Sequence, residues 1–338
     1  MRGGILYSLV APRKVGVVVR VADIPGSAGS EYWSEEMQDV DGRVAFITGG
    51  ANGIGFGMAQ AFTAAGMKVV IADIRRDHLD RALEQLRKDG RTAHGIQLDV
   101  TDRKAMAAAA DETERVFGKV HVVCNNAGIN WFGPMDEATY EDWDWIMGVN
   151  LNGVINGLVT FIPRLKAHGE GGHIVNTASM ASFVSGPGAG IYTGAKFAVR
   201  GLSECLWYHL APQGIGVSIL CPGLVKSYIY QSEQIRPKQF AHTGQAPSDE
   251  FTTRLAEVHQ MGMEPLEVGE KVLRGIRRAD LYVLSHPDHK EEVRHIFDEI
   301  MTAFPDEIPE PRRMAFEDFR RQQMAEARKK GDAALGRS

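Results

Sequence analysis

The sequence predicts an α/β fold in which helices cover both faces of a parallel β-sheet. From residue 43, short runs rich in β-branched residues alternate with helix-like segments of about 12 to 25 residues. The strand runs are RVAFIT, KVVIAD, GIQLDV, HVVCN, HIVNTA and VSILCP, with a seventh, LYVL, at residues 281 to 284. These runs are apolar at most positions, which is typical of strands buried on both faces, as in a parallel sheet.

Two long helices stand out among the segments between the strands. Thr139 and Asp142, in TYED, have the spacing of a capping box, which predicts a helix that continues through WDWIMGVNLNGVINGLVTF. A second helix is predicted from about Ile191. Because both are apolar over much of their surface, we expect a homodimer or homotetramer in which they pair. Burial against the chain's own sheet explains part of this pattern.

The composition excludes several function classes. The 338 residues are 44% hydrophobic and carry a net charge of −5, which argues against a nucleic-acid partner. No apolar run approaches the roughly 18 residues of a membrane-spanning helix. Cys124, Cys205 and Cys221 are widely spaced in apolar contexts, so we interpret them as reduced core residues of a cytoplasmic protein. His286 and His289, in HPDH, lack an evident third ligand, which favours a solvated turn over a metal site.

Two extensions flank the predicted core, which we place at residues 37–286. Residues 1–36 contain a short apolar run, cut by Pro12 and Arg13, without a clear cleavage site, and are thus a poor secretory signal. We expect this extension to be disordered or not native, with Met37 as the true start. A targeting peptide is the alternative, and mass spectrometry of the native N-terminus would distinguish the two. Residues 287–338 are predicted to form a charged helical extension, packed on the main domain or on a neighbouring subunit.

A glycine-rich turn between the first strand and the first helix predicts a nucleotide site. In TGGANGIG, the glycines Gly49, Gly53 and Gly55 would let the backbone approach a pyrophosphate at a helix N-terminus. The second strand ends at Asp73, whose carboxylate can accept hydrogen bonds from an adenosine ribose and would repel a 2′-phosphate. Ile74 adds no cation, although two arginines follow it. We therefore predict a preference for NAD over NADP.

Further motifs complete a known pattern. TGGANGIG, NNAG at 125 to 128, Asn150, Ser179, Tyr192 with Lys196, and PG at 222 to 223 resemble the short-chain dehydrogenase/reductase family in order and spacing. The resemblance covers roughly residues 40 to 285. It implies a Rossmann-type, doubly wound sheet of seven parallel strands in the order 3-2-1-4-5-6-7. It also implies a set of cofactor-binding residues: Gly49, Asn52, Gly53, Ile54, Gly55, Asp73, Ile74, Asp99, Val100, Asn126, Ala127, Gly128, Tyr192, Lys196, Pro222, Gly223, Val225 and Ser227.

The resemblance assigns the catalytic roles. Tyr192 would be the general acid/base, Ser179 would hold the substrate oxygen, and Asn150 would anchor a water leading toward Lys196. Free tyrosine titrates near pH ~10, and a nearby ammonium together with an oxidised nicotinamide would lower that value. The alcohol proton would leave through Tyr192 while the hydride goes to the cofactor. Each of these residues also has a structural explanation alone, but their joint spacing favours catalysis.

The substrate is predicted from aromatic and small residues around the reacting carbon. Trp131, Phe132, Phe183 and Tyr228 would bind it together with Ser179, beneath a lid at about residues 226–264. The long helical stretch and the charged C-terminal extension resemble the bacterial Cα-dehydrogenases of lignin-derived β-aryl ethers. This implies NAD-dependent oxidation of a benzylic alcohol. Two alternatives remain: a dehydrogenase for a hydroxysteroid or terpenol, and a non-catalytic NAD-binding regulatory protein on the same fold.

Overall fold

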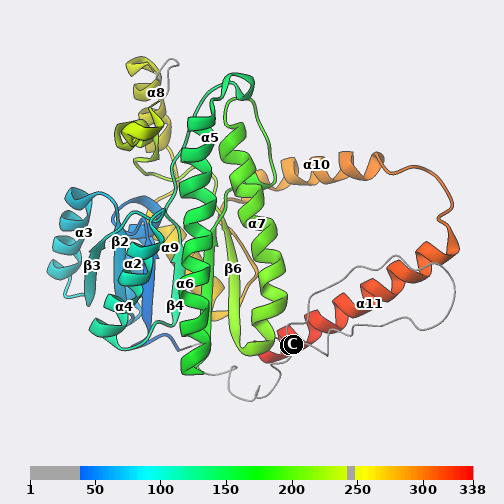
Figure 1. The fold of residues 1–338 in the computed structure, drawn as a ribbon, viewed down its shortest axis with the longest axis horizontal. Coiled ribbons are helices and arrows are strands. Elements are labelled where there is room, and N and C mark those ends of the chain that lie inside the picture. The colour runs from blue at the N-terminus through cyan, green and yellow to red at the C-terminus, as the bar shows by residue number, and fades with distance from the viewer. Residues whose placement is uncertain (1–38, 242–247, 338) are drawn as a thin grey trace.

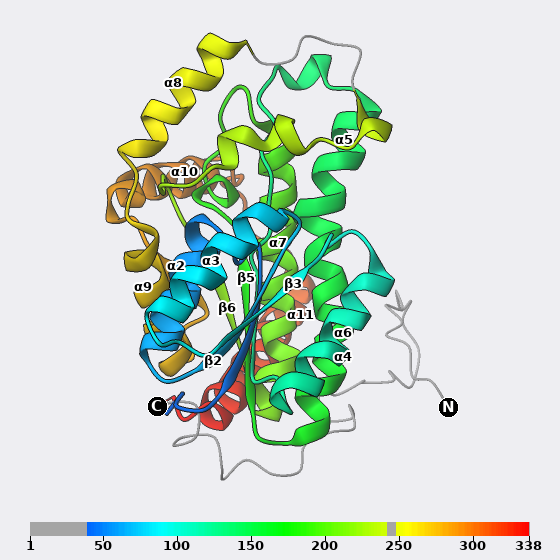
Figure 2. The same ribbon diagram turned by 90° about the vertical axis from the view of Figure 1, so that its left-hand side faces the viewer.

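The computed structural model describes residues 39–241 and 248–337, and their centre is a seven-stranded parallel sheet (Figures 1 and 2). The strands lie in the order β3-β2-β1-β4-β5-β6-β7, so the predicted fold class is confirmed. Residues 1–36 and the proposed start at Met37 lie outside the described residues. The strands are β1 Val44–Thr48, β2 Lys68–Asp73, β3 Ala93–Gln97, β4 Val122–Asn125, β5 Gly172–Thr177, β6 Ile215–Cys221 and β7 Tyr282–Leu284.

Helices form a layer on each face of the sheet. Figure 2 shows α2, α3 and α9 on one side and α4, α6 and α7 on the other. This arrangement follows from right-handed crossovers on both sides of β1, where the strand order reverses. The described helices are α2 Gly53–Ala64, α3 Arg76–Lys88, α4 Arg103–Phe117, α5 Tyr140–Met147, α6 Gly153–His168, α7 Gly190–Leu210, α8 Asp249–Gln260, α9 Pro265–Arg277, α10 Lys290–Thr302 and α11 Pro311–Ala334.

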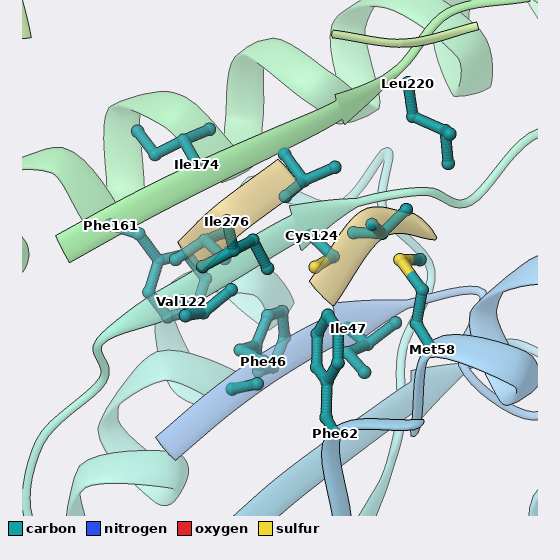
Figure 3. Packing of buried hydrophobic residues seen from close by; sticks show 14 of the residues in the cluster. Phe46, Ile47, Met58, Phe62, Val122, Cys124, Phe161, Ile174, Leu220 and Ile276 are labelled. Atoms are coloured by element: carbon teal, nitrogen blue, oxygen red, sulfur yellow. The ribbon is translucent and has the colours of Figure 1, made fainter. Parts of the chain in front are cut away.

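The core lies on both faces of the sheet, where strand side chains meet those of the two helix layers (Figure 3). Phe46 on β1 packs against Phe161 on α6, with 4.6 Å between the ring centres. On the other face, Met58 and Phe62 of α2 are fully buried with Ile276 of α9. Burial of large apolar side chains on both faces holds the sheet rigid, and the strand ends are therefore fixed in position.

The long helix predicted from Thr139 contains an irregular turn. The capping box is present, because Thr139 and Asp142 bond each other's backbone N–H groups. Gly148–Asn152 then forms a π-helical turn between α5 and α6, a feature frequent at functional sites. Contrary to the sequence expectation, Tyr140–His168 is long and apolar enough to cross a membrane by length and composition. Half of its 18-residue apolar window is buried, so it is a core helix of this fold.

The C-terminal extension projects from the body of the protein. Figure 1 shows α10 and α11 reaching away from α7, with the chain returning so that the end of α11 lies at the foot of α7. There Gly331 packs on Trp207, where a Cβ would come within 2.7 Å of the indole ring.

The three cysteines are free thiols, but Cys205 is exposed, so its interpretation as a core residue is wrong. Cys205 is not among the buried residues of α7, because some apolar side chains of this helix, such as Phe197, are exposed.

Candidate active site

A cavity of about 700 Å³ opens at the carboxyl ends of the strands. This is the edge at which ligands bind in open α/β sheets, because the strand order reverses there and the crossovers leave a crevice. The lining comes from the loops after β1, β2, β3, β4, β5 and β6, and from the segment that the sequence predicted as a lid. The cavity is lined mainly by apolar groups, with polar groups at a few positions.

The glycine-rich turn forms one wall of the cavity, and each glycine is required by close contact. Gly49 and Gly53 have φ values of 61° and 47°, which favour glycine. A Cβ on Gly49 would lie 2.9 Å from the Cα of Ala127, and one on Gly53 would lie 2.8 Å from the Cβ of Ser227. A Cβ on Gly55 would lie 2.0 Å from the carbonyl oxygen of Gly49. The turn thus presents the N-terminus of α2 to the cavity with no side chain in between, as a pyrophosphate requires.

Asp73 lies at the end of β2 and lines the same cavity. Its carboxylate accepts the N–H of Ala51 at 3.2 Å and that of Arg75 at 2.9 Å. Burial raises the pKa of Asp73, and these two bonds oppose the increase. Arg75 also lines the cavity, but its Nε and Nη2 donate to the two carboxylate oxygens of Asp77 at 2.8 Å each. The cation beside Asp73 is therefore already paired within the protein.

The loop after β4 is tied to the glycine-rich turn. Thr48 Oγ1 accepts the N–H groups of Asn126 and Ala127 at 2.9 and 3.0 Å. In return, Asn126 Nδ2 donates to the carbonyl oxygen of Thr48 at 3.1 Å. These bonds explain the asparagine at position 126 of NNAG. Its side-chain amide links the end of β4 to the end of the neighbouring strand β1. The bonds leave Ala127 and Gly128 on the cavity wall.

Ser179, Tyr192 and Lys196 come together at the centre of the cavity wall. Tyr192 and Lys196 lie one turn apart on α7, with Lys196 Nζ 5.5 Å from the centre of the tyrosine ring. Ser179 follows β5, and its hydroxyl acts on Tyr192 by lowering the pKa of the phenol. Lys196 is 3% exposed and donates to the carbonyl oxygen of Thr177 at 2.9 Å. A phenol, a hydroxyl and a buried ammonium in one place can exchange a proton with a substrate oxygen.

Burial shifts the pKa of both Tyr192 and Lys196. Burial raises the pKa of Tyr192, and the hydrogen bond with Ser179 only opposes that increase. Burial also lowers the pKa of Lys196 to about 8. The physical reason is that withdrawal from water disfavours the charged form of both side chains. The predicted lowering of the tyrosine pKa includes the charge of an oxidised nicotinamide, so it stays a prediction.

Asn150 is fully buried behind the cavity, within the π-helical turn. Its Oδ1 accepts the N–H of Ile129 at 2.9 Å, and its Nδ2 donates to the carbonyl oxygen of the same residue at 2.8 Å. A Cβ placed on Gly128 would lie 3.4 Å from Asn150 Oδ1 and 3.6 Å from Lys196 Nζ. The side-chain amide of Asn150 and the ammonium of Lys196 therefore both lie close to Gly128. Through its two bonds to Ile129, the Asn150 side chain holds the loop after β4 in place.

Most of the predicted site residues line this one cavity. They are Gly49, Asn52, Gly53, Ile54, Asp73, Ile74, Asp99, Val100, Asn126, Ala127, Gly128, Phe132, Ser179, Tyr192, Lys196, Pro222, Gly223, Val225, Ser227 and Tyr228. Four predicted residues do not line it: Gly55, Asn150, Trp131 and Phe183. Gly55 and Asn150 lie directly behind the lining and support it, as described above.

Three of the predicted substrate residues are placed differently from the expectation. Trp131 is 8% exposed and packs in a small core with Trp145, so it supports the wall from behind. Phe183 lies under the guanidinium of Arg200 at 4.0 Å and lines a second cavity. Tyr228 lines the main cavity, but its ring is 5.8 Å from that of His78, near Asp73.

The structure also places residues in the cavity that the sequence reasoning missed. The lid contributes apolar side chains, one histidine and a few polar side chains, and these are Ile229, Ile235, Pro237, Phe240, Leu255, Val258, His259, Gln231, Ser232 and Gln239. Trp145 of α5 and His289 beyond β7 complete the wall. In the HPDH segment, Pro287 and Asp288 are exposed as expected for a solvated turn, but His286 is 8% exposed. Within residues 39–241 and 248–337, no group of three or more His, Cys, Asp or Glu side chains could hold a metal ion.

The fold and the site together define a nucleotide-dependent oxidoreductase of the Rossmann type. The family profile described as short chain dehydrogenase matches residues 43–237, and the chain belongs to that family. It is therefore an enzyme of a family that uses NAD or NADP. This finding removes the alternative of a non-catalytic regulatory protein.

Three known proteins show how similar its relatives are. The C alpha-dehydrogenase of Sphingobium sp. strain NBRC 103272 / SYK-6 is 44% identical over 79% of this chain and 88% of its own length. A structure from Novosphingobium aromaticivorans, assigned to the short-chain dehydrogenases, is 46% identical with a TM-score of 0.75, covering 87% of this chain and 99% of its own. A short-chain dehydrogenase/reductase from Burkholderia phymatum, in complex with NAD, is 34% identical with a TM-score of 0.75, covering 80% and 99%. The resemblance to Cα-dehydrogenases inferred from the sequence is thus confirmed.

Proposed function

We propose that the enzyme oxidises a bulky, benzylic secondary alcohol to the ketone with NAD, as a Cα-dehydrogenase of lignin-type aryl ethers. The observation that carries this proposal is one continuous cavity. It runs from Asp73 past Ser179 and Tyr192 into an apolar enclosure under the lid. Similarity to the Sphingobium C alpha-dehydrogenase supports the same substrate class.

The cofactor preference follows from two carboxylates. Asp73 would meet the adenosine ribose, where it favours hydroxyls and repels a phosphate. Arg75, which lines the cavity beside Asp73, is engaged by Asp77 through two of its three donor nitrogens, Nε and Nη2. The hydrogen bonds to Arg75 hold the pKa of Asp77 well below its usual value, so this ion pair persists at neutral pH. A 2′-phosphate would therefore meet the carboxylate of Asp73 and an arginine whose charge is already balanced by Asp77.

The chain's own residues would manage the proton. Ser179 would hold the substrate hydroxyl beside Tyr192, whose phenolate form accepts the alcohol proton. Lys196 keeps a positive charge nearby and favours that phenolate. Asn150 fixes the loop that carries Gly128, and a water held at its main chain would connect Lys196 to solvent. NAD, when bound, takes up the hydride from the carbinol carbon.

The substrate enclosure is built from aromatic and aliphatic side chains. Phe132, after β4, meets Phe251 of α8 edge to face, with ring centres 5.7 Å apart. This contact joins the predicted substrate loop to α8, within the segment predicted as a lid. Trp145 and Phe240 face the cavity from α5 and the lid. An aromatic alcohol would bury its ring against such walls, since aromatic pairs prefer offset or edge-to-face contacts.

We further propose a cytoplasmic homodimer or homotetramer. Several apolar side chains are exposed on the two long helices, and they include Val159 at 71% and Ile155 at 38% on α6 and Phe197 at 42% on α7. Apolar side chains gathered on neighbouring helices favour helix pairing between subunits. Light scattering of the full chain tests this assembly, and a monomer would contradict it.

The test of the function is NADH formation by the purified enzyme, with NAD and NADP in parallel. The substrates are guaiacylglycerol-β-guaiacyl ether, a hydroxysteroid and a simple 1-aryl alkanol. We expect turnover of the ether to exceed that of the other two. Turnover of the steroid without turnover of the ether would favour the alternative, a dehydrogenase for another hydrophobic alcohol such as a hydroxysteroid or terpenol.

A further inference from the structure

The histidine after the last strand lies beside the loop after β6. In the parallel pair of these strands, Cys221 is opposite Leu284, at the carboxyl end of each strand. Continuing that register by two residues brings His286 next to Gly223. This is the loop of PG at 222 to 223, which the family resemblance places at the nicotinamide. The HPDH motif, which the sequence analysis interpreted as a solvated turn, therefore begins beside the loop expected at the nicotinamide.

His286 holds this loop by both ring nitrogens. Nδ1 accepts the backbone N–H of Gly223 at 2.9 Å, and Nε2 lies 2.9 Å from the carbonyl oxygen of Leu224. A backbone N–H can only donate and a carbonyl oxygen can only accept. The ring is therefore neutral, with its hydrogen on Nε2. Ser285 Oγ also lies 2.8 Å from Nδ1, on the same side as Gly223.

The loop in turn holds the turn of the catalytic serine. The carbonyl oxygen of Pro222 accepts the N–H of Met180 at 2.9 Å, and Ser179 Oγ lies 3.5 Å from the same oxygen. A continuous chain of contacts thus runs from His286 through Gly223 and Pro222 to Ser179. Displacement of the loop would move both the wall at the nicotinamide and the hydroxyl that orients the substrate.

Gly223 is glycine because the imidazoles approach its backbone so closely. A Cβ there would lie 2.8 Å from His289 Nε2 and 2.9 Å from His286 Cγ. The His286 ring is fixed by two hydrogen bonds and is nearly buried, so it could not move aside without losing them. The close approach shows that the loop and the two histidines are fitted to each other.

We propose that His286 is a positioning residue for hydride transfer, which holds residues 222–224 in the geometry that orients the nicotinamide and Ser179. The inference rests on the proposed function, because it needs the nicotinamide to lie at this loop. Phosphate and adenosine contacts lie at the other end of the cavity, so loss of His286 leaves overall cofactor affinity nearly intact. Misplacement of reacting atoms by about 1 Å can cost about 100-fold in rate.

The experiment compares four variants of the full chain: His286→Ala, His286→Asn, His286→Gln and, as control, His295→Ala. His295 is an exposed histidine on α10. Asparagine places an oxygen near the position of Nδ1 and keeps the acceptor for Gly223. Glutamine places an amide nitrogen near Nε2 and keeps the donor to Leu224. Both are partial replacements, whereas alanine removes both bonds.

Two readouts are used, and one does not depend on turnover. NADH titration gives the dissociation constant and the emission of the bound nicotinamide. Oxidation of the alcohol, unlabelled and deuterated at the carbinol carbon, gives kcat and its isotope effect. For His286→Ala we expect kcat to fall roughly 10- to 100-fold, the isotope effect to rise, and the bound NADH emission to change. The dissociation constant should stay within about threefold of the unmodified enzyme.

Rescue of kcat by asparagine or glutamine, with unchanged His295→Ala, would support the proposal and show which bond matters. The proposal is overturned if His286→Ala keeps the kcat, isotope effect and NADH emission of the unmodified enzyme. It is also overturned if kcat, NADH affinity and melting temperature all fall together, since that indicates general loss of structure. If the unmodified enzyme turns over none of the alcohols, the proposed function fails, while NADH emission still decides the role of His286.

Discussion

Arg236 of the lid and Asp142 of α5 form an ion pair that is almost completely withdrawn from water. The distance from Arg236 Nη2 to Asp142 Oδ1 is 2.5 Å, and the two side chains are 5% and 4% exposed. The guanidinium also lies 4.7 Å from the centre of the Trp145 ring, on the cavity wall. Because Asp142 also forms the capping box with Thr139, this pair joins the lid to the first turn of α5.

Arg236→Met should therefore loosen the lid and destabilise the fold. Removing one partner of a buried ion pair leaves a buried charge, which costs about 3–5 kcal/mol. We expect a lower free energy of unfolding in urea and a higher KM for a bulky alcohol, with NAD affinity unchanged. Arg254→Ala on α8 is the control, because its pair with Glu250 is 74% and 75% exposed and should contribute about 0–1 kcal/mol. Equal losses in the two variants would contradict a role for burial.

Tyr192→Phe should leave NAD binding nearly intact and remove most turnover. The ring keeps its packing on α7, but the hydroxyl that meets Ser179 is lost, and no proton can then be accepted from the alcohol. General acid–base groups contribute about 10²- to 10⁴-fold, so kcat should fall within that range. NADH titration and steady-state kinetics measure the two effects separately. Full activity in this variant would refute the mechanism.

Lys196→Met should abolish activity without lowering stability. Burial lowers the pKa of Lys196 to about 8, so at neutral pH the fold contains a charged group that it disfavours. The unfolded chain binds that proton more tightly, hence this group's contribution to stability rises as the pH increases from about 8 to its unfolded value near 10.4. We expect the melting temperature of the variant at pH 7 to equal or exceed that of the unmodified enzyme. The difference should shrink toward pH 10, and a large decrease at pH 7 would contradict the prediction.

Asp77→Asn should improve the use of NADP. Loss of the carboxylate charge weakens its hold on Arg75, which lines the cavity next to Asp73 and could then reach a 2′-phosphate. The matched control is Asp80→Asn. It weakens the 3.0 Å pair with Arg76, whose side chain is not part of the cavity lining. We expect the ratio of kcat/KM for NADP to that for NAD to rise about tenfold only in Asp77→Asn, which corresponds to about 1.4 kcal/mol. A similar rise in both variants would show a general effect of surface charge.

His173 should make the fold sensitive to acid. It is fully buried on β5, with Nε2 2.8 Å from Ser218 Oγ, and burial lowers its pKa to about 3. The unfolded chain takes up this proton near pH ~6.5, so the contribution is complete above that pH and is lost as the pH falls toward 3. In His173→Asn, the free energy of unfolding should decrease less steeply between pH 6.5 and 4. Parallel pH profiles, with the exposed His295→Asn as reference, would show that His173 is not responsible.

The parts of the site that could be predicted from sequence are those whose geometry is local. The glycine-rich turn joins a strand to the next helix, and Tyr192 and Lys196 share one face of a helix because they are four residues apart. Asp73, Asn126 and Ser179 follow apolar strands, and parallel strands end at the same edge. No knowledge of long-range contacts is needed to bring such residues to one side of the sheet.

The errors have equally specific causes. Trp131 and Phe183 are aromatic residues near the site in sequence. The loop geometry buries Trp131 in a small core and places Phe183 against the guanidinium of Arg200. His286 was taken for a solvated residue because its partners, Gly223 and Leu224, are more than sixty positions away. The pKa of Tyr192 depends on burial, which no spacing of charges reveals.

By itself, the sequence determined the α/β class, the strand order through its family motifs, the turn for a nucleotide, and the serine, tyrosine and lysine of the site. These depend on periodicity, on glycine's backbone freedom and on residues a few positions apart. Only the tertiary structure decided which side chains enclose the substrate, how the lid is fastened, and which histidine supports the loop after β6. Those features depend on the register between β6 and β7 and on contacts between distant loops, and desolvation at these contacts sets the protonation of Tyr192 and Lys196.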